Sequence, residues 1–234
     1  MSLKNIEIIA FDADDTLWEN ENFFRDGEKQ FCEILNEFQP NELIMKELFR
    51  VEVQNMEIYG YGIKAFILSL VETALLVSKK QVRPEQVEAI LDIGKSMLEK
   101  EVILLDGIRE VLEELSPRYR LVLATKGDLL DQERKLKKSG LMNYFHHIEV
   151  MTHKKEENYQ QLLKHLDIEA DQFLMIGNSL KSDILPVINL GGAAVHVPYY
   201  TTWVFEQMNP EDIKSDRFFE LKKIHDVLTL FNGA

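Results

Sequence analysis

The sequence predicts an α/β protein, in which helices cover a parallel β-sheet and a helical domain is inserted after the first strand. Short apolar or β-branched segments alternate with helix-like segments along most of the chain, which is the pattern of a parallel sheet. One gap breaks this alternation. About a hundred residues between the first two expected strands read almost wholly as helix, far more than a usual connection contains.

The expected strands are short, and each ends at residues that suit a tight turn or polar chemistry. They are residues 6–11, 119–124, 147–150, 173–176 and 193–197. Helices are expected between them, over residues 107–115, 130–139, 156–165 and 181–190. In the first of these helices an apolar stripe at helical spacing is formed by Ile108, Val111, Leu112 and Leu115.

Apolar residues in the inserted region also recur at helical spacing. Phe31 and Leu35 lie four residues apart in one segment, and Leu70 and Ala74 do so in a second. Pro84 suits the first turn of a third helix. We therefore expect a helical domain over residues 18–103 and a core formed by residues 1–17 and 104–234.

Composition and charge narrow the functional classes. Of 234 residues, 45% are hydrophobic, which is enough for a packed core. The formal net charge of −13 leads us to expect neither a nucleic-acid polymer nor an anionic membrane as a partner. Cys32 is the only cysteine, so no intrachain disulfide can form. The sequence shows neither a signal-peptide pattern nor a membrane-spanning stretch, so we expect a soluble, cytoplasmic protein.

An acidic cluster follows the first expected strand. Asp12, Asp14 and Asp15 stand where that strand ends, and ligands of open α/β sheets bind beyond the carboxyl ends of strands. Asp12 and Asp14 are separated by one residue, so at such a turn they can converge on one substrate. Clustered carboxylates repel one another unless a cation such as Mg²⁺ is bound between them. Taken alone, the segment can also be read as an Asp-rich turn or a helix cap.

Polar residues follow three further strands. Thr125 and Gly127 come after the second strand and suit a site where the backbone approaches an anion. Lys154 and Lys155 come after the third, before a helix N-terminus where a lysine can neutralise phosphate. The fourth segment runs from Gly177 through Asn178 and Ser179 to Asp183, and offers two oxygen ligands to a hard metal. Each of these alone has an ordinary alternative: a structural turn, a solvated lysine or a helix cap.

In this order, the four segments resemble the motifs of the haloacid dehalogenase superfamily, and the resemblance extends from end to end of the chain. Asp12-Ala13-Asp14-Asp15-Thr16 resembles the first motif, Thr125 the second, Lys154 the third, and Gly177-Asn178-Ser179 through Asp183 the fourth. The resemblance implies a Rossmann-like core with an inserted helical cap. The insertion between the first and second motifs is typical of one cap class of that superfamily.

The resemblance also implies a mechanism. Asp12 would attack phosphorus and form an aspartyl-phosphate, and Asp14 would serve first as general acid and then as general base. The superfamily's dehalogenases lack a carboxylate at the position of Asp14, so a phosphatase is favoured. A phosphomutase would share every motif and is the alternative enzyme, and a non-catalytic binding protein on the same fold is the alternative from another class.

The remaining site residues follow by the same resemblance. Mg²⁺ would be held by Asp12, the backbone carbonyl of Asp14, Asn178 and Asp183. The phosphoryl oxygens would be held by Thr125, Lys154 and the backbone N–H of Lys126. The substrate implied is a small phosphate ester, such as a nucleoside monophosphate or a sugar phosphate.

Two departures from the superfamily pattern bear on these roles. The fourth motif usually begins Gly-Asp, and Asn178 stands where the Asp is expected, so weaker metal binding is predicted. Lys154 and Lys155 are adjacent, and Lys154 is preferred because it lies nearer the strand end. We further expect Trp18, Glu19 and Asn20, which follow the first motif, to lie near the entrance to the site.

Overall fold

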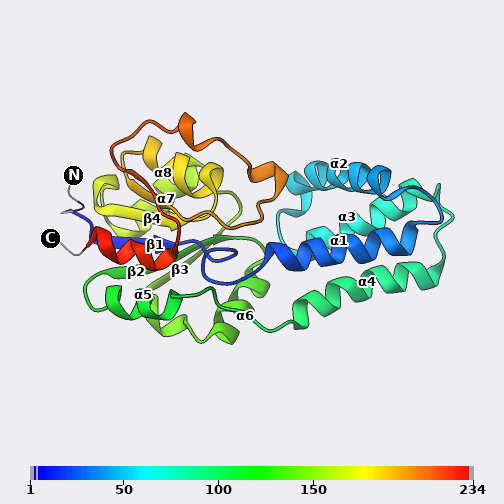
Figure 1. Cartoon of the computed structure of the whole chain (residues 1–234), viewed down its shortest axis with the longest axis horizontal. Helices are drawn as coiled ribbons and strands as arrows, with labels where there is room; N and C mark the ends of the chain where they lie inside the picture. The colour runs from blue at the N-terminus through cyan, green and yellow to red at the C-terminus, as the bar shows by residue number, and fades with distance from the viewer. Residues whose placement is uncertain (1–2, 4, 232–234) are drawn as a thin grey trace. The chain divides into compact units, whose positions relative to one another are not determined.

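The computed structural model describes residues 3 and 5–231, and this part of the chain divides into two compact units (Figure 1). The core unit comprises the residues up to Glu21, Val102–Lys126 and the residues from Arg134 onward. The helical unit comprises Asn22–Glu101 and Gly127–Glu133. Most of the predicted inserted domain falls in the helical unit, which also takes in a short segment directly after Lys126. That the helical unit acts as a cap stays a prediction.

The core unit contains a fully parallel sheet. Among the described residues it has six strands in the order β3-β2-β1-β4-β5-β6. Their bounds are Ile8–Phe11 (β1), Arg120–Lys126 (β2), His147–Met151 (β3), Phe173–Gly177 (β4), Ala193–His196 (β5) and Phe218–Glu220 (β6). The expected strands are all present. β6 was not expected, because its three residues are too few to show a pattern.

Helices cover both faces of the sheet, as the sequence predicts for a parallel sheet. On one face, α5 (Ile108–Leu115) and α6 (Leu129–Ser139) pack on side chains such as Ile9 and Leu121. On the other face, α7 (Glu156–Leu166) and α8 (Leu185–Asn189) pack on side chains such as Ile8 and Val122. Successive strand residues therefore enter different cores, and the strands read as continuous apolar runs. The α/β prediction is confirmed.

The helical unit is built from α1 (Glu21–Leu35), α2 (Asn41–Tyr59), α3 (Ile63–Val77) and α4 (Pro84–Glu99). Its core includes Phe31, Leu48 and Leu70, all fully buried. The sequence predicted three helical segments here and missed α2. The apolar residues of α2 lie on both faces of the helix: Ile44 and Leu48 are buried, whereas Leu43 and Ile58 are exposed. A helix of this kind shows no clear apolar stripe.

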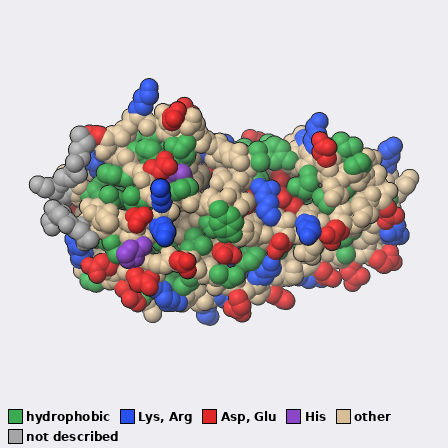
Figure 2. Space-filling model, viewed as in Figure 1, with side chains coloured by type: hydrophobic (Ala, Val, Ile, Leu, Met, Phe, Trp, Pro, Cys, Tyr) green, Lys and Arg blue, Asp and Glu red, His purple; other side chains and the backbone are tan. Residues whose placement is uncertain are grey.

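The surface carries charges of both signs. On the face seen in Figure 2, basic side chains are interspersed with acidic ones rather than gathered into a continuous patch. In the described part of the chain, we find no helix whose length and apolar character would allow it to cross a bilayer.

Gly94 permits the close approach of α4 to α3. A Cβ atom at this position would lie 1.9 Å from Cδ1 of Ile67. We expect Gly94→Ala to lower the free energy of unfolding by about 1–3 kcal/mol, because overpacking outweighs the gain of about 1 kcal/mol in helix propensity. Urea unfolding of the variant would measure the effect. The double variant Gly94→Ala/Ile67→Ala removes the clash and is the control, and a stabilised Gly94→Ala protein would contradict this packing.

Candidate active site

The first candidate site residue stands at the centre of the sheet. Register pairs Phe11 of β1 with Leu123 of β2 on one side and with Ile176 of β4 on the other. Asp12 follows directly, and its backbone N–H donates to the carbonyl of Ile176 at 2.9 Å. β1 lies between β2 and β4, and the sequence of strands runs in opposite directions on its two sides. Open α/β sheets bind their ligands at such a reversal.

Lys154 joins two buried carboxylates. Its Nζ lies 2.5 Å from Oδ1 of Asp12 and 2.6 Å from Oδ1 of Asp183, and the Lys154 side chain is 1% exposed. Burial raises the pKa of Asp12 to about 7, although the Lys154 ammonium acts in the opposite direction. Burial alone would lower the pKa of Lys154, but the carboxylates of Asp12 and Asp183 outweigh it and raise that pKa above its usual value. Lys154 is therefore an ammonium.

Asp183 is held by the backbone of its own loop. Its Oδ2 accepts the backbone N–H of Ser179 at 3.0 Å, which leaves Oδ1 facing Lys154. The chain makes a π-helical turn over Leu180–Ile184 before α8 begins, so the helix predicted over residues 181–190 is only partly regular. Pro186 in the first turn of α8 fits this break. Turns of this kind are frequent at functional sites.

Thr16 links the first motif to the fourth. Its hydroxyl lies 3.1 Å from Oδ2 of Asp12 and 3.3 Å from Oδ1 of Asn178, in reach of both acceptors. The oxygens of Asp12 and Asn178 therefore converge. His196 on β5 also contacts the fourth motif: its Nε2 lies 3.1 Å from the backbone carbonyl of Asn178. Thr16 was expected only as part of the first motif, without a role of its own.

This donor set fits a magnesium ion. Asp12, Asn178 and Asp183 supply carboxylate and amide oxygens, the ligands that Mg²⁺ prefers, and Mg²⁺ commonly needs only one or two carboxylates because it keeps several waters. Within residues 3 and 5–231, no group of three or more His, Cys, Asp or Glu side chains is arranged to hold a metal. A site with two carboxylates and neutral oxygens does not need such a group.

Asp14 faces a different set of partners from Asp12. Oδ1 of Asp14 accepts the indole N–H of Trp18 at 2.7 Å and lies 3.0 Å from Nζ of Lys135 on α6. The same Nζ lies 2.8 Å from Oδ1 of Asn20. Trp18 was expected near the entrance, but its side chain is buried. Lys135 was not singled out, because a lysine on a charged helix reads as solvated.

The turn between Asp14 and α1 is closed by Asp15. Its carboxylate accepts the backbone N–H of Asn20 at 2.9 Å and that of Glu21 at 3.0 Å, so it satisfies donors at the start of α1. Asp15 has a left-handed backbone with a φ of 61°, which aspartate tolerates better than most residues. Burial raises the pKa of Asp15 to about 8. The acidic cluster is thus both a cap and a candidate catalytic segment.

Thr125 and Lys126 end β2, beside β1. Thr125 is buried, and its hydroxyl lies 3.5 Å from the backbone carbonyl of Lys126. The Lys126 ammonium is bonded to Glu206 and lies 2.9 Å from Oγ of Ser182. Glu206 also accepts from Oγ of Ser179 at 2.5 Å, so it ties the second motif to the fourth. Glu206, which ends a short 3₁₀ helix after β5, carries no signal in the sequence around it.

A family profile covers most of this chain. The profile described as haloacid dehalogenase-like hydrolase matches residues 6–191. The chain belongs to the haloacid dehalogenase-like hydrolase family. The match confirms the resemblance drawn from the four motifs, and with it the expectation that the chain is a hydrolase.

Individual relatives agree with this assignment. A haloacid dehalogenase-like hydrolase from Xanthomonas campestris is 34% identical and superimposes with a TM-score of 0.87 over 97% of this chain and 92% of that one. The N-acylneuraminate-9-phosphatase of Mus musculus is 24% identical over 215 residues, which are 87% of this chain and 84% of that protein. A Bacillus subtilis hydrolase of the superfamily, bound to magnesium in its crystal structure, is 17% identical with a TM-score of 0.70 over 98% of this chain and 100% of that one. The last likeness shows the fold alone.

Gly177 leaves room for the Asp183 side chain. A Cβ atom at Gly177 would lie 2.3 Å from Oδ2 of Asp183. We expect Gly177→Ala to lower the free energy of unfolding by about 1–3 kcal/mol through this overpacking, and to abolish the binding of vanadate measured by calorimetry. Gly191→Ala is the control, because its Cβ enters open space and its left-handed φ costs only about 1–2 kcal/mol. Vanadate binding that is equal in the two variants would contradict a role of Gly177 in the site.

Proposed function

We propose that this chain is a magnesium-dependent phosphatase, which hydrolyses a small phosphorylated metabolite through an aspartyl-phosphate on Asp12. The observation that carries the proposal is the position of Asp12 at the end of the central strand, between the buried Lys154 ammonium and the Thr16 hydroxyl. A second carboxylate, that of Asp14, follows two residues later and contacts different side chains, those of Trp18 and Lys135. A nucleophile and a proton carrier are thus present in one short loop.

In the proposed reaction, a carboxylate oxygen of Asp12 attacks the phosphorus of the ester while Asp14 gives its proton to the leaving oxygen. Asp14, now a carboxylate, then takes a proton from the water that attacks the aspartyl-phosphate. Phosphate leaves, Asp12 is restored and Asp14 is again protonated. Lys154, Thr125 and the backbone N–H of Lys126 would hold the phosphoryl oxygens.

The metal belongs to the same proposal. Mg²⁺, held by Asp12, the Asp14 backbone carbonyl, Asn178 and Asp183, would offset negative charge on the transferring phosphoryl group. A sugar phosphate is the favoured substrate class, because the mouse relative is an N-acylneuraminate-9-phosphatase. Nucleoside monophosphates are the matched comparison in a substrate screen.

The proposal is tested by the hydrolysis of 4-nitrophenyl phosphate and of a panel of sugar phosphates, with Mg²⁺ and with EDTA. We expect metal-dependent turnover that falls by at least about 10³-fold in Asp12→Asn, because that change removes the nucleophile. Asp216→Asn, an exposed aspartate in the core unit, is the matched control and keeps full activity. Turnover that survives EDTA or the loss of Asp12 would contradict the mechanism.

The neutral ligand Asn178 gives a second test. Asp12, Asp183 and Lys154 together leave one net negative charge at the metal site, and a carboxylate at position 178 would add another. We expect Asn178→Asp to bind Mg²⁺ about tenfold more tightly, a change of about 1.4 kcal/mol. Titration of the thermal midpoint with Mg²⁺ measures the affinity independently of turnover. Equal affinities for the two proteins would refute a charge effect at this position.

A further inference from the structure

The general acid of the proposed reaction is held by two donors that the family motifs do not include. Nζ of Lys135 lies 3.0 Å from Oδ1 and 3.2 Å from Oδ2 of Asp14, so one ammonium contacts both carboxylate oxygens. The indole N–H of Trp18 donates to Oδ1 at 2.7 Å. Lys135 is itself fixed by Oδ1 of Asn20 at 2.8 Å. All these residues belong to the core unit.

These contacts are sheltered from solvent. The side chains of Lys135 and Asp14 are 16% and 22% exposed, and Trp18 is fully buried. An exposed ion pair is screened by water and holds neither partner in place. Here both donors lie closest to Oδ1, at 2.7 and 3.0 Å, so together they restrict the rotation of the Asp14 carboxyl group and leave Oδ2 as the oxygen that carries the proton. The carboxyl group that must transfer a proton is therefore pre-oriented.

We propose that Lys135 is a positioning residue for proton transfer, which with Trp18 holds the Asp14 carboxyl group in the orientation that the reaction needs. This inference rests on the proposed function. As the bond from phosphorus to the ester oxygen breaks, the proton of Asp14 passes to that oxygen, and the Asp14 carboxylate left behind lies against the Lys135 ammonium. When water attacks the aspartyl-phosphate, its proton passes to Asp14, the bond from phosphorus to Asp12 breaks, and the cycle closes.

The contacts of Lys135 separate this role from phosphate binding. Its ammonium lies against Asp14 and Asn20, whereas Lys154 is the lysine bonded to Asp12 and Asp183. A lysine that held the phosphoryl group would affect all phosphate esters alike. A lysine that positions the proton donor matters only for esters whose leaving oxygen must be protonated as it departs.

The test compares two esters with the whole 234-residue chain, loaded with Mg²⁺. Benzyl phosphate releases a basic alkoxide, which needs the proton, and 4-nitrophenyl phosphate releases a stable anion, which does not. Alcohol release is measured in a single turnover with enzyme in excess, so that the shared hydrolysis of the aspartyl-phosphate does not mask the first step. We expect Lys135→Met to slow release from benzyl phosphate by about 10- to 100-fold, and from 4-nitrophenyl phosphate by less than about threefold.

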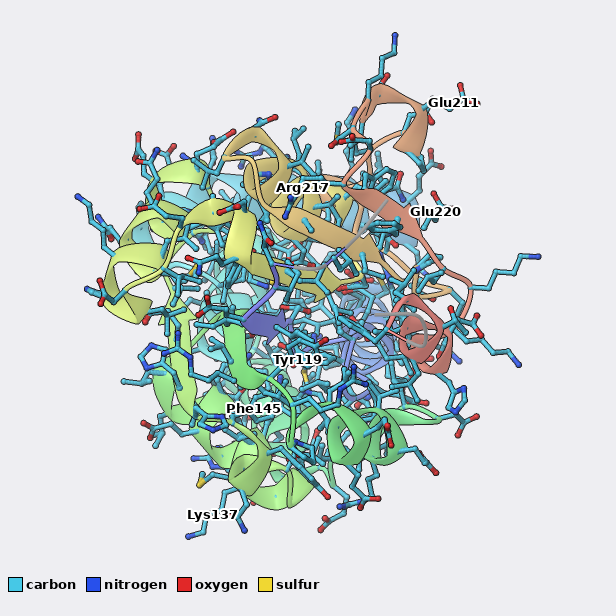
Figure 3. All side chains as sticks on the ribbon, turned by 90° about the vertical axis from the view of Figure 1, so that its left-hand side faces the viewer. Tyr119, Lys137, Phe145, Glu211, Arg217 and Glu220 are labelled. Atoms are coloured by element: carbon cyan, nitrogen blue, oxygen red, sulfur yellow. The ribbon has the colours of Figure 1, made fainter. Side chains whose placement is uncertain are left out.

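Lys137→Met is the matched control. Lys137 lies two residues further along α6 and extends outward from the ribbon in Figure 3. This variant keeps wild-type rates on both esters, and thermal melting tests whether both variants fold. If Lys135→Met fails to fold, Lys135→Gln replaces it and shows the same selective loss.

Equal slowing on both esters, or unchanged rates on both, overturns the positioning role while wild-type turnover upholds the proposed function. A wild-type protein that hydrolyses neither these esters nor a sugar phosphate overturns the proposed function, and this inference with it.

Discussion

A buried ammonium shared by two buried carboxylates is the constraint on which the core unit depends. Lys154 follows β3, Asp12 ends β1 and Asp183 lies in the turn after β4, so three separate segments supply one charge cluster. Removing the Lys154 ammonium would leave two buried carboxylates without a compensating charge, whereas removing either carboxylate would still leave one ion pair. The ion pairs therefore require the carboxyl ends of β1, β3 and β4 to lie close together.

The backbone around this cluster departs from regular geometry. Asp15 adopts a left-handed conformation, and the segment Leu180–Ile184 is π-helical. Such departures cost free energy and persist only where the surrounding structure fixes them. The surrounding structure here is the apolar packing on both faces of the sheet, where the side chains of β1 alternate between the two cores. Both of these departures thus lie beyond the carboxyl ends of central strands, beside the residues of the candidate site.

Features that depend on neighbouring residues could be predicted from the sequence, whereas contacts between residues far apart in the sequence could not. The buried strands and the acidic turn after β1 each show their character within a few residues. The partnership of Lys126 with Glu206 spans 80 residues, and that of Lys135 with Asp14 spans 121, so neither leaves a mark in the surrounding sequence. Trp18 is a further example, because a tryptophan beside polar residues suggested a position at the entrance. In the structure its ring packs in the core, and its indole N–H donates to Asp14. The short strand β6 and the two-sided helix α2 lack the periodicity that makes an element recognisable.

The helical unit consists of two separate segments, and this determines which residues a chimaera with a related protein would have to exchange together. The segment Gly127–Glu133 belongs to this unit although it lies outside the long insertion, and Lys64 on α3 pairs with Asp128 of that segment at 3.0 Å. A Cβ atom at Gly62 would lie 3.2 Å from the backbone nitrogen of Asp128, so the two segments are also matched in shape. A chimaera that transplants only the continuous insertion would separate these partners. The helical unit is therefore discontinuous: its second part begins directly after Lys126 and includes the first residues of α6. A chimaera would therefore keep the contacts between the two segments only when both segments come from the same protein.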